Sequence, residues 1–208
     1  MILAEDDVIY IASERRSVSK MLEIEQKFAN ADFAAIEKRL AEWKARRGEE
    51  HTEADHYFNA PDRDFARTDE AFRLRRIGSA NFLTYKGPKH PGAVKVRTEL
   101  EIPLRDGDEA ATQFMQLLAH LAYRAVAVVR KHRRTYHLER GGFALTVCLD
   151  EVEQLGCFAE VEIVAPDEQV DAARAVLADT AAALGLTNLE RRSYLGLLLQ
   201  KMVTEPEA

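Results

Sequence analysis

The sequence has little cysteine, no surplus of basic residues and no long apolar run. Its only cysteines, Cys148 and Cys157, do not form a C-x-x-C pair, so neither a disulfide framework nor a cysteine zinc site is indicated. This low cysteine content suits a reducing compartment, and we expect a cytoplasmic protein. The formal net charge of −6 argues against a general nucleic-acid-binding protein. No apolar run approaches the length of a membrane span, so no membrane partner is expected.

The usual backbone loops that bind phosphate are also absent. The chain contains neither G-x-x-x-x-G-K-[ST] nor G-x-G-x-x-G. No internal repeat, low-complexity tract or Gly/Ser-rich linker divides the chain, so we expect an N-terminal extension over residues 1–20 and a single domain over residues 21–203. The extension has a short apolar patch preceded by acidic residues, which is not the pattern of a secretory signal.

The hydrophobic content of 47% is ample for a folded core. Apolar residues at helical spacing predict helices over 32–47, 108–123, 167–184 and 188–202, with Gly48 as the end of the first. Strand-like runs predict strands over 21–28, 55–58, 71–77, 81–86, 94–104, 125–138, 143–152 and 157–164. Because strands outnumber helices and do not alternate with them regularly, we expect a mostly antiparallel α+β fold.

The first predicted strand, MLEIEQKF, carries charge on one face. Glu23, Glu25 and Lys27 occupy every second position, and apolar residues occupy most of the others. Successive side chains of a strand point to opposite faces, so one face is charged and the other is mostly apolar. The charged face is either ordinary solvated surface or the lining of a site.

The same alternation recurs in six later strands. Basic residues alternate in some of them: Arg73, Arg75, Lys86, Arg97, Lys131 and Arg133. Acidic residues alternate or close the strand in others: Glu99, Glu101, Asp150, Glu160 and Glu162. A solvated face normally mixes Thr, Ser, Gln and Lys, so this separation of basic and acidic pairs favours the lining of a site.

A closed sheet with these faces inward would form a tunnel that contains both signs of charge. Buried charge at this density is unfavourable unless it is paired or bound to ions. A strongly anionic ligand with divalent cations satisfies both signs, because Arg and Lys bind phosphate oxygens and carboxylates bind the metal. The pattern therefore indicates a nucleotide or polyphosphate site.

Glu23-x-Glu25-x-Lys27 resembles the E-x-E-x-K signature of the CYTH superfamily, which contains class IV adenylyl cyclases, thiamine triphosphatases and related triphosphate tunnel metalloenzymes. Later segments resemble the family's other motifs in order: paired arginines in 55–76, a lysine hairpin in 82–89, a glutamate strand in 97–104, a K-x-R strand in 128–136, an aspartate and E-x-E ending in 149–163, and a terminal helix in 192–199. The resemblance implies an eight-stranded antiparallel β-barrel-like tunnel with external helices.

The resemblance also implies roles for the charged residues. Mg²⁺ or Mn²⁺ would be bound by five carboxylates: Glu23, Glu25, Asp150, Glu160 and Glu162. Of these, Glu25 and Glu160 would be the best ligands. The triphosphate would be bound, and its reaction catalysed, by basic residues: Lys27, Arg73, Arg75, Lys86, Lys131 and Arg133. The substrate-binding set also includes Arg97, Glu99 and Glu101, of which the glutamates would orient basic residues. Lys27 either contacts phosphate, helps to activate the nucleophile, or forms a salt bridge with Glu25 or Glu160.

The segments 55–76 and 82–89 look most like the class IV adenylyl cyclase branch, which implies conversion of ATP to 3′,5′-cyclic AMP and pyrophosphate. Several of these cyclases carry a His-Phe pair before the first strand, where this sequence has SVSKM. Two alternatives therefore stay open: hydrolysis of thiamine triphosphate, inorganic tripolyphosphate or a nucleoside triphosphate, and triphosphate binding without turnover. The expected partner is a small-molecule triphosphate, with ATP favoured, and the protein is expected to be a monomer or a homodimer.

Overall fold

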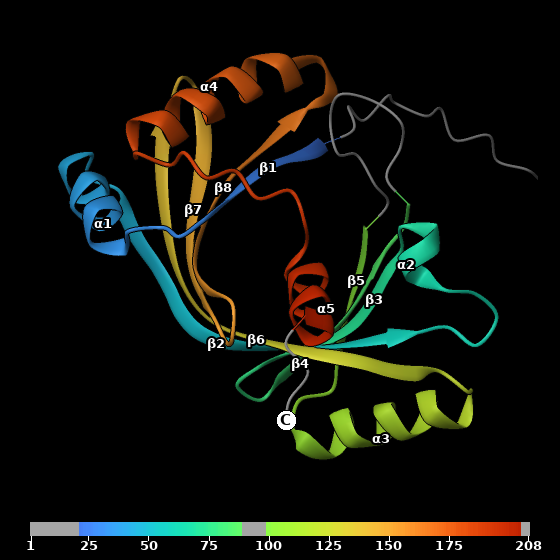
Figure 1. Ribbon diagram of the computed structural model, residues 1–208. Helices are drawn as coiled ribbons and strands as arrows, with labels where there is room; N and C mark the ends of the chain where they lie inside the picture. Colours follow the sequence, from blue (N-terminus) through green and yellow to red (C-terminus); the bar gives the residue numbers. More distant parts are fainter. Residues whose placement is uncertain (1–20, 89–98, 205–208) are drawn as a thin grey trace, which may run out of the picture.

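Eight antiparallel strands form one curled sheet in the computed structural model, which describes residues 21–88 and 99–204 (Figure 1). The strands are β1 (Met21–Ala29), β2 (Arg46–Asn59), β3 (Ala71–Ile77), β4 (Ala80–Lys86), β5 (Glu99–Leu104), β6 (Arg124–Arg140), β7 (Phe143–Val152) and β8 (Gly156–Pro166). Their order in the sheet is β1-β8-β7-β6-β2-β3-β4-β5. Within the described residues β1 and β5 do not pair with each other, so the sheet is a half-barrel. The expected antiparallel α+β fold is confirmed.

In the described part of the chain, five α-helices accompany the sheet. They are α1 (Phe33–Glu42), α2 (Phe65–Thr68), α3 (Asp108–His120), α4 (Val170–Ala183) and α5 (Tyr194–Thr204), and a 3₁₀ turn at Asp167–Gln169 precedes α4. Helices α1, α3 and α4 lie on the convex side of the sheet, whereas α5 lies inside its curve (Figure 1). In the described part of the chain, no helix has the length and apolar character that crossing a membrane requires.

The alternation of the strands explains the outer core. Leu22 and Ile24 of β1 and Ile163 of β8 point away from the charged face and pack in one cluster with Leu40 of α1 and Leu177 of α4. Each fully buried side chain of this size contributes roughly 1.5–3 kcal/mol to stability. The apolar faces of β1 and β8 therefore pack against the helices, and their charged faces line the concave side.

A second outer cluster holds α3 against the other end of the sheet. Leu74 of β3, which is fully buried, packs with Phe58 of β2 and with Ala111 and Leu118 of α3. Arg73 and Arg75 flank Leu74 in the sequence, so the same alternation turns both arginines to the concave side. The two outer clusters together fix which face of each strand lines the interior.

Helix α5 departs from the expectation of external helices. Its Leu198 packs with Tyr57 of β2, Val129 of β6 and Phe158 of β8, which are apolar residues on the concave side. An apolar stripe at helical spacing predicts a packed helix but does not specify which face of a sheet it covers. The last helix therefore covers part of the concave face, and it lies close to the charged residues.

The predicted helix over residues 32–47 is too long. Helix α1 begins after the N-cap Asp32 and ends at Glu42, and Lys44 then adopts a left-handed conformation with φ of 56°. Gly48, the predicted helix end, lies instead within β2, where a Cβ would come within 2.8 Å of the His137 ring on β6. Gly48 is therefore required by the close approach of two strands rather than by a helix terminus.

Two further boundaries differ from the prediction. Strand β2 was predicted over residues 55–58 alone but covers Arg46–Asn59. The last helix begins at Tyr194 rather than near 188, because the preceding residues run beside β1: the Ala29 N–H donates to the Asn188 carbonyl, and the Glu190 N–H donates to the Lys27 carbonyl. The predicted strand over 94–104 is described only from Glu99 onward, and residues 1–20 of the expected extension lie outside the described residues.

Candidate functional site

The strand register places opposite charges side by side on the concave face. Lys27 of β1 lies opposite Glu160 of β8, and Arg133 of β6 lies opposite Asp150 of β7. Arg75 of β3 lies opposite Asp55 of β2 in the same way. Cross-strand neighbours on one face are close enough for their side chains to interact, so the register itself builds a network of charges.

Asp55 holds the two arginines of β3. Its carboxylate accepts hydrogen bonds from Arg75 Nε at 2.7 Å and Nη2 at 2.8 Å, and from Arg73 Nη1 at 2.9 Å. Asp55 is only 3% exposed. Burial alone would raise the pKa of this carboxyl, but the hydrogen bond from Arg75 and the charge of Arg73 outweigh it and lower the pKa. Asp55 therefore remains ionised and fixes both guanidinium groups.

Glu53 makes a similar link between β3 and β6. Its Oε2 lies 3.0 Å from Arg75 Nη2 and 3.2 Å from Lys131 Nζ, and His51 Nε2 lies 2.9 Å from its Oε1. Burial opposes ionisation of Glu53, yet the charges of Lys131 and Arg75 lower its pKa. Three basic side chains of two strands, Arg73, Arg75 and Lys131, are thus held by two buried acids.

Asp150 is the centre of the other half of the network. Arg133 binds it in a bidentate manner, with Nε 2.7 Å from Oδ1 and Nη2 2.6 Å from Oδ2, and Lys131 Nζ lies 3.3 Å from Oδ2. The Tyr194 hydroxyl of α5 donates to the same Oδ2 at 2.8 Å. Burial works against ionisation, but these partners lower the pKa of Asp150 to about 2. Arg133 also contacts Glu160.

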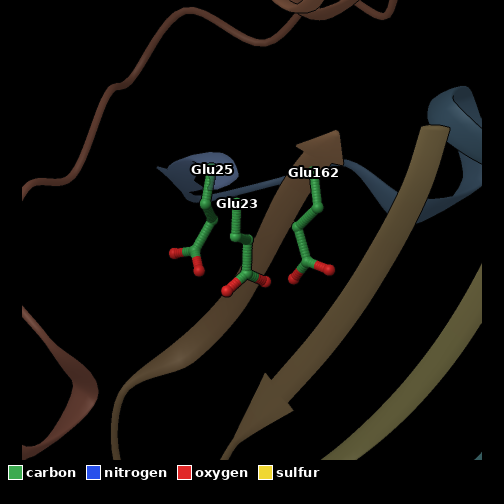
Figure 2. A group of neighbouring side chains, drawn as sticks. All are labelled: Glu23, Glu25 and Glu162. Carbon is green, nitrogen blue, oxygen red and sulfur yellow. The ribbon is translucent and has the colours of Figure 1, made fainter. Parts of the chain in front are cut away.

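Three carboxylates beside this network do not take part in its ion pairs. Glu23 and Glu25 of β1 and Glu162 of β8 extend to the same side of the sheet (Figure 2), and one oxygen of each lies within 4.8 Å of one oxygen of the others. Within the described residues, none of the three forms an ion pair. Burial and the neighbouring carboxylates, Glu160 above all, raise the pKa of Glu25 to about 7 and that of Glu162 to about 8. The pKa of Glu23 is also raised, chiefly by burial.

Comparison with known proteins identifies the family to which this arrangement belongs. The family model of the CYTH domain matches residues 21–194, which include all eight strands and the start of α5. The chain is a member of the CYTH family. Members of this family bind triphosphate substrates and are triphosphate tunnel metalloenzymes, so the resemblance seen in the sequence is confirmed.

Individual relatives agree with this membership. A protein of Methanocaldococcus jannaschii named "Putative adenylate cyclase" is 32% identical over 180 residues, which are 85% of this chain and 98% of the relative. A solved structure of a Pyrococcus horikoshii protein is 36% identical, has a TM-score of 0.73 and covers 86% of this chain and 99% of its own. A Hippeastrum protein, for which a dominant triphosphatase activity is described, is 13% identical, with a TM-score of 0.60 and coverage of 87% and 96%. At that identity it shows the fold alone.

The carboxylate trio of this CYTH domain fits a hard divalent cation. Mg²⁺ and Mn²⁺ are bound through carboxylate oxygens, and closely spaced carboxylates without cationic partners repel one another until a cation or protons neutralise them. The raised pKa values of Glu25 and Glu162 report this repulsion together with burial. The two other predicted ligands are differently placed, because Asp150 and Glu160 already bind Arg133.

The remaining predicted residues of the CYTH domain lie on β1, β4 and β5. Lys86 Nζ lies 2.8 Å from a carboxylate oxygen of Glu99, a contact with a basic residue of the kind predicted for this glutamate. Glu101 instead accepts a hydrogen bond from the Thr84 hydroxyl at 3.3 Å. Lys27 Nζ donates to the backbone carbonyl of Arg192 at 2.6 Å. Arg97 lies outside the described residues.

Three residues of the charged network were not predicted as site residues. Glu53 and Asp55 alternate with Tyr57 in the sequence EADHY, which is the same signal that identified the other strands, but the predicted strand began too late to show it. Tyr194 gave no signal, because one aromatic residue at the start of a helix is ordinarily a packing residue. Tyr57, which lies on the same face of β2 as Glu53 and Asp55, has its hydroxyl 3.2 Å from Arg73 Nη1.

Proposed function

We propose that this CYTH protein is a divalent-metal-dependent adenylyl cyclase that converts ATP to 3′,5′-cyclic AMP and pyrophosphate. The observation that carries the proposal is the adjacency of a carboxylate trio and a fixed set of basic side chains on one concave face. The relative from Methanocaldococcus jannaschii, with the cyclase name given above, supports the choice of reaction.

The basic residues of the network would bind the triphosphate. Arg73, Arg75 and Arg133 each use part of their guanidinium group to contact a buried acid, and such fixed cations lose little conformational entropy when phosphate binds. Preorganised positive charge stabilises the charge that develops on the departing pyrophosphate. Lys86 and Lys131 would add to it from the neighbouring strands.

Glu23, Glu25 and Glu162 would hold Mg²⁺ or Mn²⁺, with Glu160 beside them on β8. Such a cation, when bound, supplies neutralisation of phosphate charge and orientation of the phosphate oxygens. Asp150 serves a different purpose in this proposal. Because its oxygens accept from Arg133, Lys131 and Tyr194, it fixes the basic residues and the start of α5 rather than the metal.

In the proposed reaction the ribose 3′-hydroxyl attacks the α-phosphorus of ATP. A phosphorus–oxygen bond forms to the ribose, the bond between the α-phosphorus and the bridging oxygen breaks, and pyrophosphate leaves while the hydroxyl proton passes to solvent. The protein contributes position and charge rather than covalent chemistry, as is usual for reactions at phosphorus.

Hydrolysis of a triphosphate is the second candidate function. The charged side chains described above suit phosphate and metal without regard to a nucleoside, so tripolyphosphate or thiamine triphosphate would satisfy them equally well. The triphosphatase activity described for the Hippeastrum protein, which has the same fold, supports hydrolysis as the second candidate. Binding without turnover is a third possibility.

Product analysis distinguishes these functions. Purified protein with ATP and Mn²⁺ should release 3′,5′-cyclic AMP and pyrophosphate in equal amounts, as measured by chromatography with authentic standards. Formation of ADP and orthophosphate, or cleavage of tripolyphosphate or thiamine triphosphate without cyclic AMP, would instead establish the triphosphatase. Binding of all these compounds with no product would establish the non-catalytic alternative.

A further inference from the structure

The segment that leads into α5 encloses Lys27. The Lys27 ammonium donates to the Arg192 carbonyl at 2.6 Å and lies 4.2 Å from the centre of the Tyr194 ring. The same segment is bonded to the backbone of β1, since the Glu190 N–H donates to the Lys27 carbonyl at 2.7 Å and Leu189 forms a β-bridge with Phe28. Both the main chain and the side chain of Lys27 are thus contacted by the C-terminal segment.

Tyr194 is itself fixed from three directions. Its hydroxyl donates to Asp150 Oδ2 at 2.8 Å, and its ring packs edge-on against Phe158 with the ring centres 5.0 Å apart. Lys131 Nζ lies 5.5 Å from the centre of the same ring. One aromatic ring therefore lies beside Lys27 and Lys131 and is anchored to the acid that binds Arg133.

An aromatic face beside an ammonium restrains a side chain that is otherwise highly flexible. Cation–π contacts contribute about 0.5–2 kcal/mol, whereas ordering a lysine side chain costs up to about 2 kcal/mol of conformational entropy. The ring and the Arg192 carbonyl therefore offset part of the entropy that ordering Lys27 costs before a substrate arrives. Misplacement of a catalytic group by about 1 Å lowers a rate by roughly a hundredfold.

We propose that Tyr194 is a positioning residue, whose ring, together with the Arg192 carbonyl, fixes the Lys27 ammonium at the point where it meets the triphosphate. This inference rests on the proposed function for the reaction that Lys27 serves, but the position of Lys27 is a property of the protein alone. The ring of Tyr194 restrains the Lys27 ammonium, and the Tyr194 hydroxyl fixes the ring through its hydrogen bond to Asp150.

Steady-state kinetics separate this role from general stabilisation. With the triphosphate that the protein turns over, Tyr194→Leu should lower kcat about tenfold to a hundredfold and change KM less than about threefold, whereas Tyr194→Phe, which keeps the ring, should recover most of kcat. Tyr136→Phe is the matched control, because Tyr136 donates to Glu37 on the convex side. In a Lys27→Met background, Tyr194→Leu should have no further effect on kcat. If Tyr194→Leu lowers kcat by the same factor in the wild type and in the Lys27→Met background, the proposal is overturned.

Nuclear magnetic resonance tests the position of Lys27 without turnover. In protein with isotope-labelled lysine, the side-chain signal that disappears in Lys27→Met should be shifted upfield by the ring in the wild type and in Tyr194→Phe, and should move to the ordinary lysine position in Tyr194→Leu. A Lys27 signal that is the same in Tyr194→Leu as in the wild type would overturn the proposal whatever the activity. If the wild type turns over no triphosphate, the proposed function fails, and this measurement still decides the role of Tyr194.

Discussion

Asp55 binds Arg75 through both of its carboxylate oxygens, at 2.7 Å and 2.8 Å, and the carboxylate is buried within the concave face. A bidentate pair of this kind fixes the direction of the guanidinium group as well as its distance. Because Asp55 also binds Arg73, one acid determines where two of the proposed phosphate-binding residues lie.

Removal of Asp55 should therefore destabilise the protein and weaken triphosphate binding together. Asp55→Ala removes the acid that two half-buried guanidinium groups share, although Arg75 keeps its contact with Glu53. Breaking a buried ion pair typically costs about 3–5 kcal/mol, so we expect a loss of up to that size in the free energy of unfolding by urea. Asp62→Ala is the control, because its ion pair with Arg63 is exposed and should contribute less than about 1 kcal/mol. Equal stabilities of the two variants would contradict the role assigned to Asp55.

Arg133 and Arg134 are adjacent in β6, but their side chains lie on opposite faces of the sheet. Arg133 binds Asp150 on the concave side, whereas Arg134 binds Glu37 of α1 on the convex side. A charge-assisted hydrogen bond contributes about 1.5–3 kcal/mol, so Arg133→Ala should lower the affinity for tripolyphosphate roughly tenfold to a hundredfold in calorimetric titrations. Arg134→Ala should leave the affinity unchanged. A similar loss in both variants would mean that general charge, rather than the concave face, governs binding.

The carboxylate trio should determine the requirement for metal. Glu25→Gln and Glu162→Gln should each lower turnover with Mn²⁺ by at least about a hundredfold, because changes even outside the direct ligands of a metal typically cost 10–100-fold. Glu151→Gln, an exposed change on β7, should have no effect. Direct Mn²⁺ binding, followed by electron paramagnetic resonance, should be weakened in the same two variants. Normal Mn²⁺ binding in both would place the metal elsewhere.

The metal-free protein should lose stability as pH rises through neutrality. Glu25 and Glu162 have pKa values raised to about 7 and about 8, so the folded protein binds protons that the unfolded chain releases near pH 4.5. In the folded protein both carboxyl groups are fully ionised only above about pH 8, and this ionisation destabilises the fold. The free energy of unfolding, measured with a chelator present, should therefore be lower at about pH 9 than at about pH 6. Asp150, with a pKa lowered to about 2, contributes equally at both values. Glu162→Gln should reduce this difference in unfolding free energy between the two pH values. If the difference is unchanged in Glu162→Gln, other titrating groups cause it.

The alternation of charge in the sequence was sufficient to predict which face of β1, β3, β6 and β8 lines the concave side. Period-two patterning assigns each side chain of a strand to one of two faces, and the apolar partners Leu22, Ile24 and Leu74 identify the buried one. It was not sufficient to separate Glu160 from Glu162, of which one binds Arg133 and the other belongs to the carboxylate trio. That difference depends on the register between strands and on side-chain reach, which alternation within one strand does not contain.

Other features depended on tertiary contacts. Residues 46–54 are strongly polar and follow a helix, so their strand character arises from pairing with β6 and, at Glu53 and Ala54, also with β3. Gly48 was interpreted as a helix end because its role, the close approach to His137, involves a residue far along the chain. Tyr194 gave no sign of its contacts with Lys27 and Asp150 for the same reason.

The contact between Lys27 and the Arg192 carbonyl joins positions 165 residues apart, and it has a consequence for biosynthesis. A chain that emerges from the ribosome presents β1 well before β8 and the α5 segment, so β1 can acquire these neighbours only after both have been synthesised. Contacts of such long sequence separation form late and slow the search for the native fold. We expect the charged face to remain incomplete until the α5 segment has left the ribosome, so that a nascent chain neither retains metal nor binds triphosphate before that point.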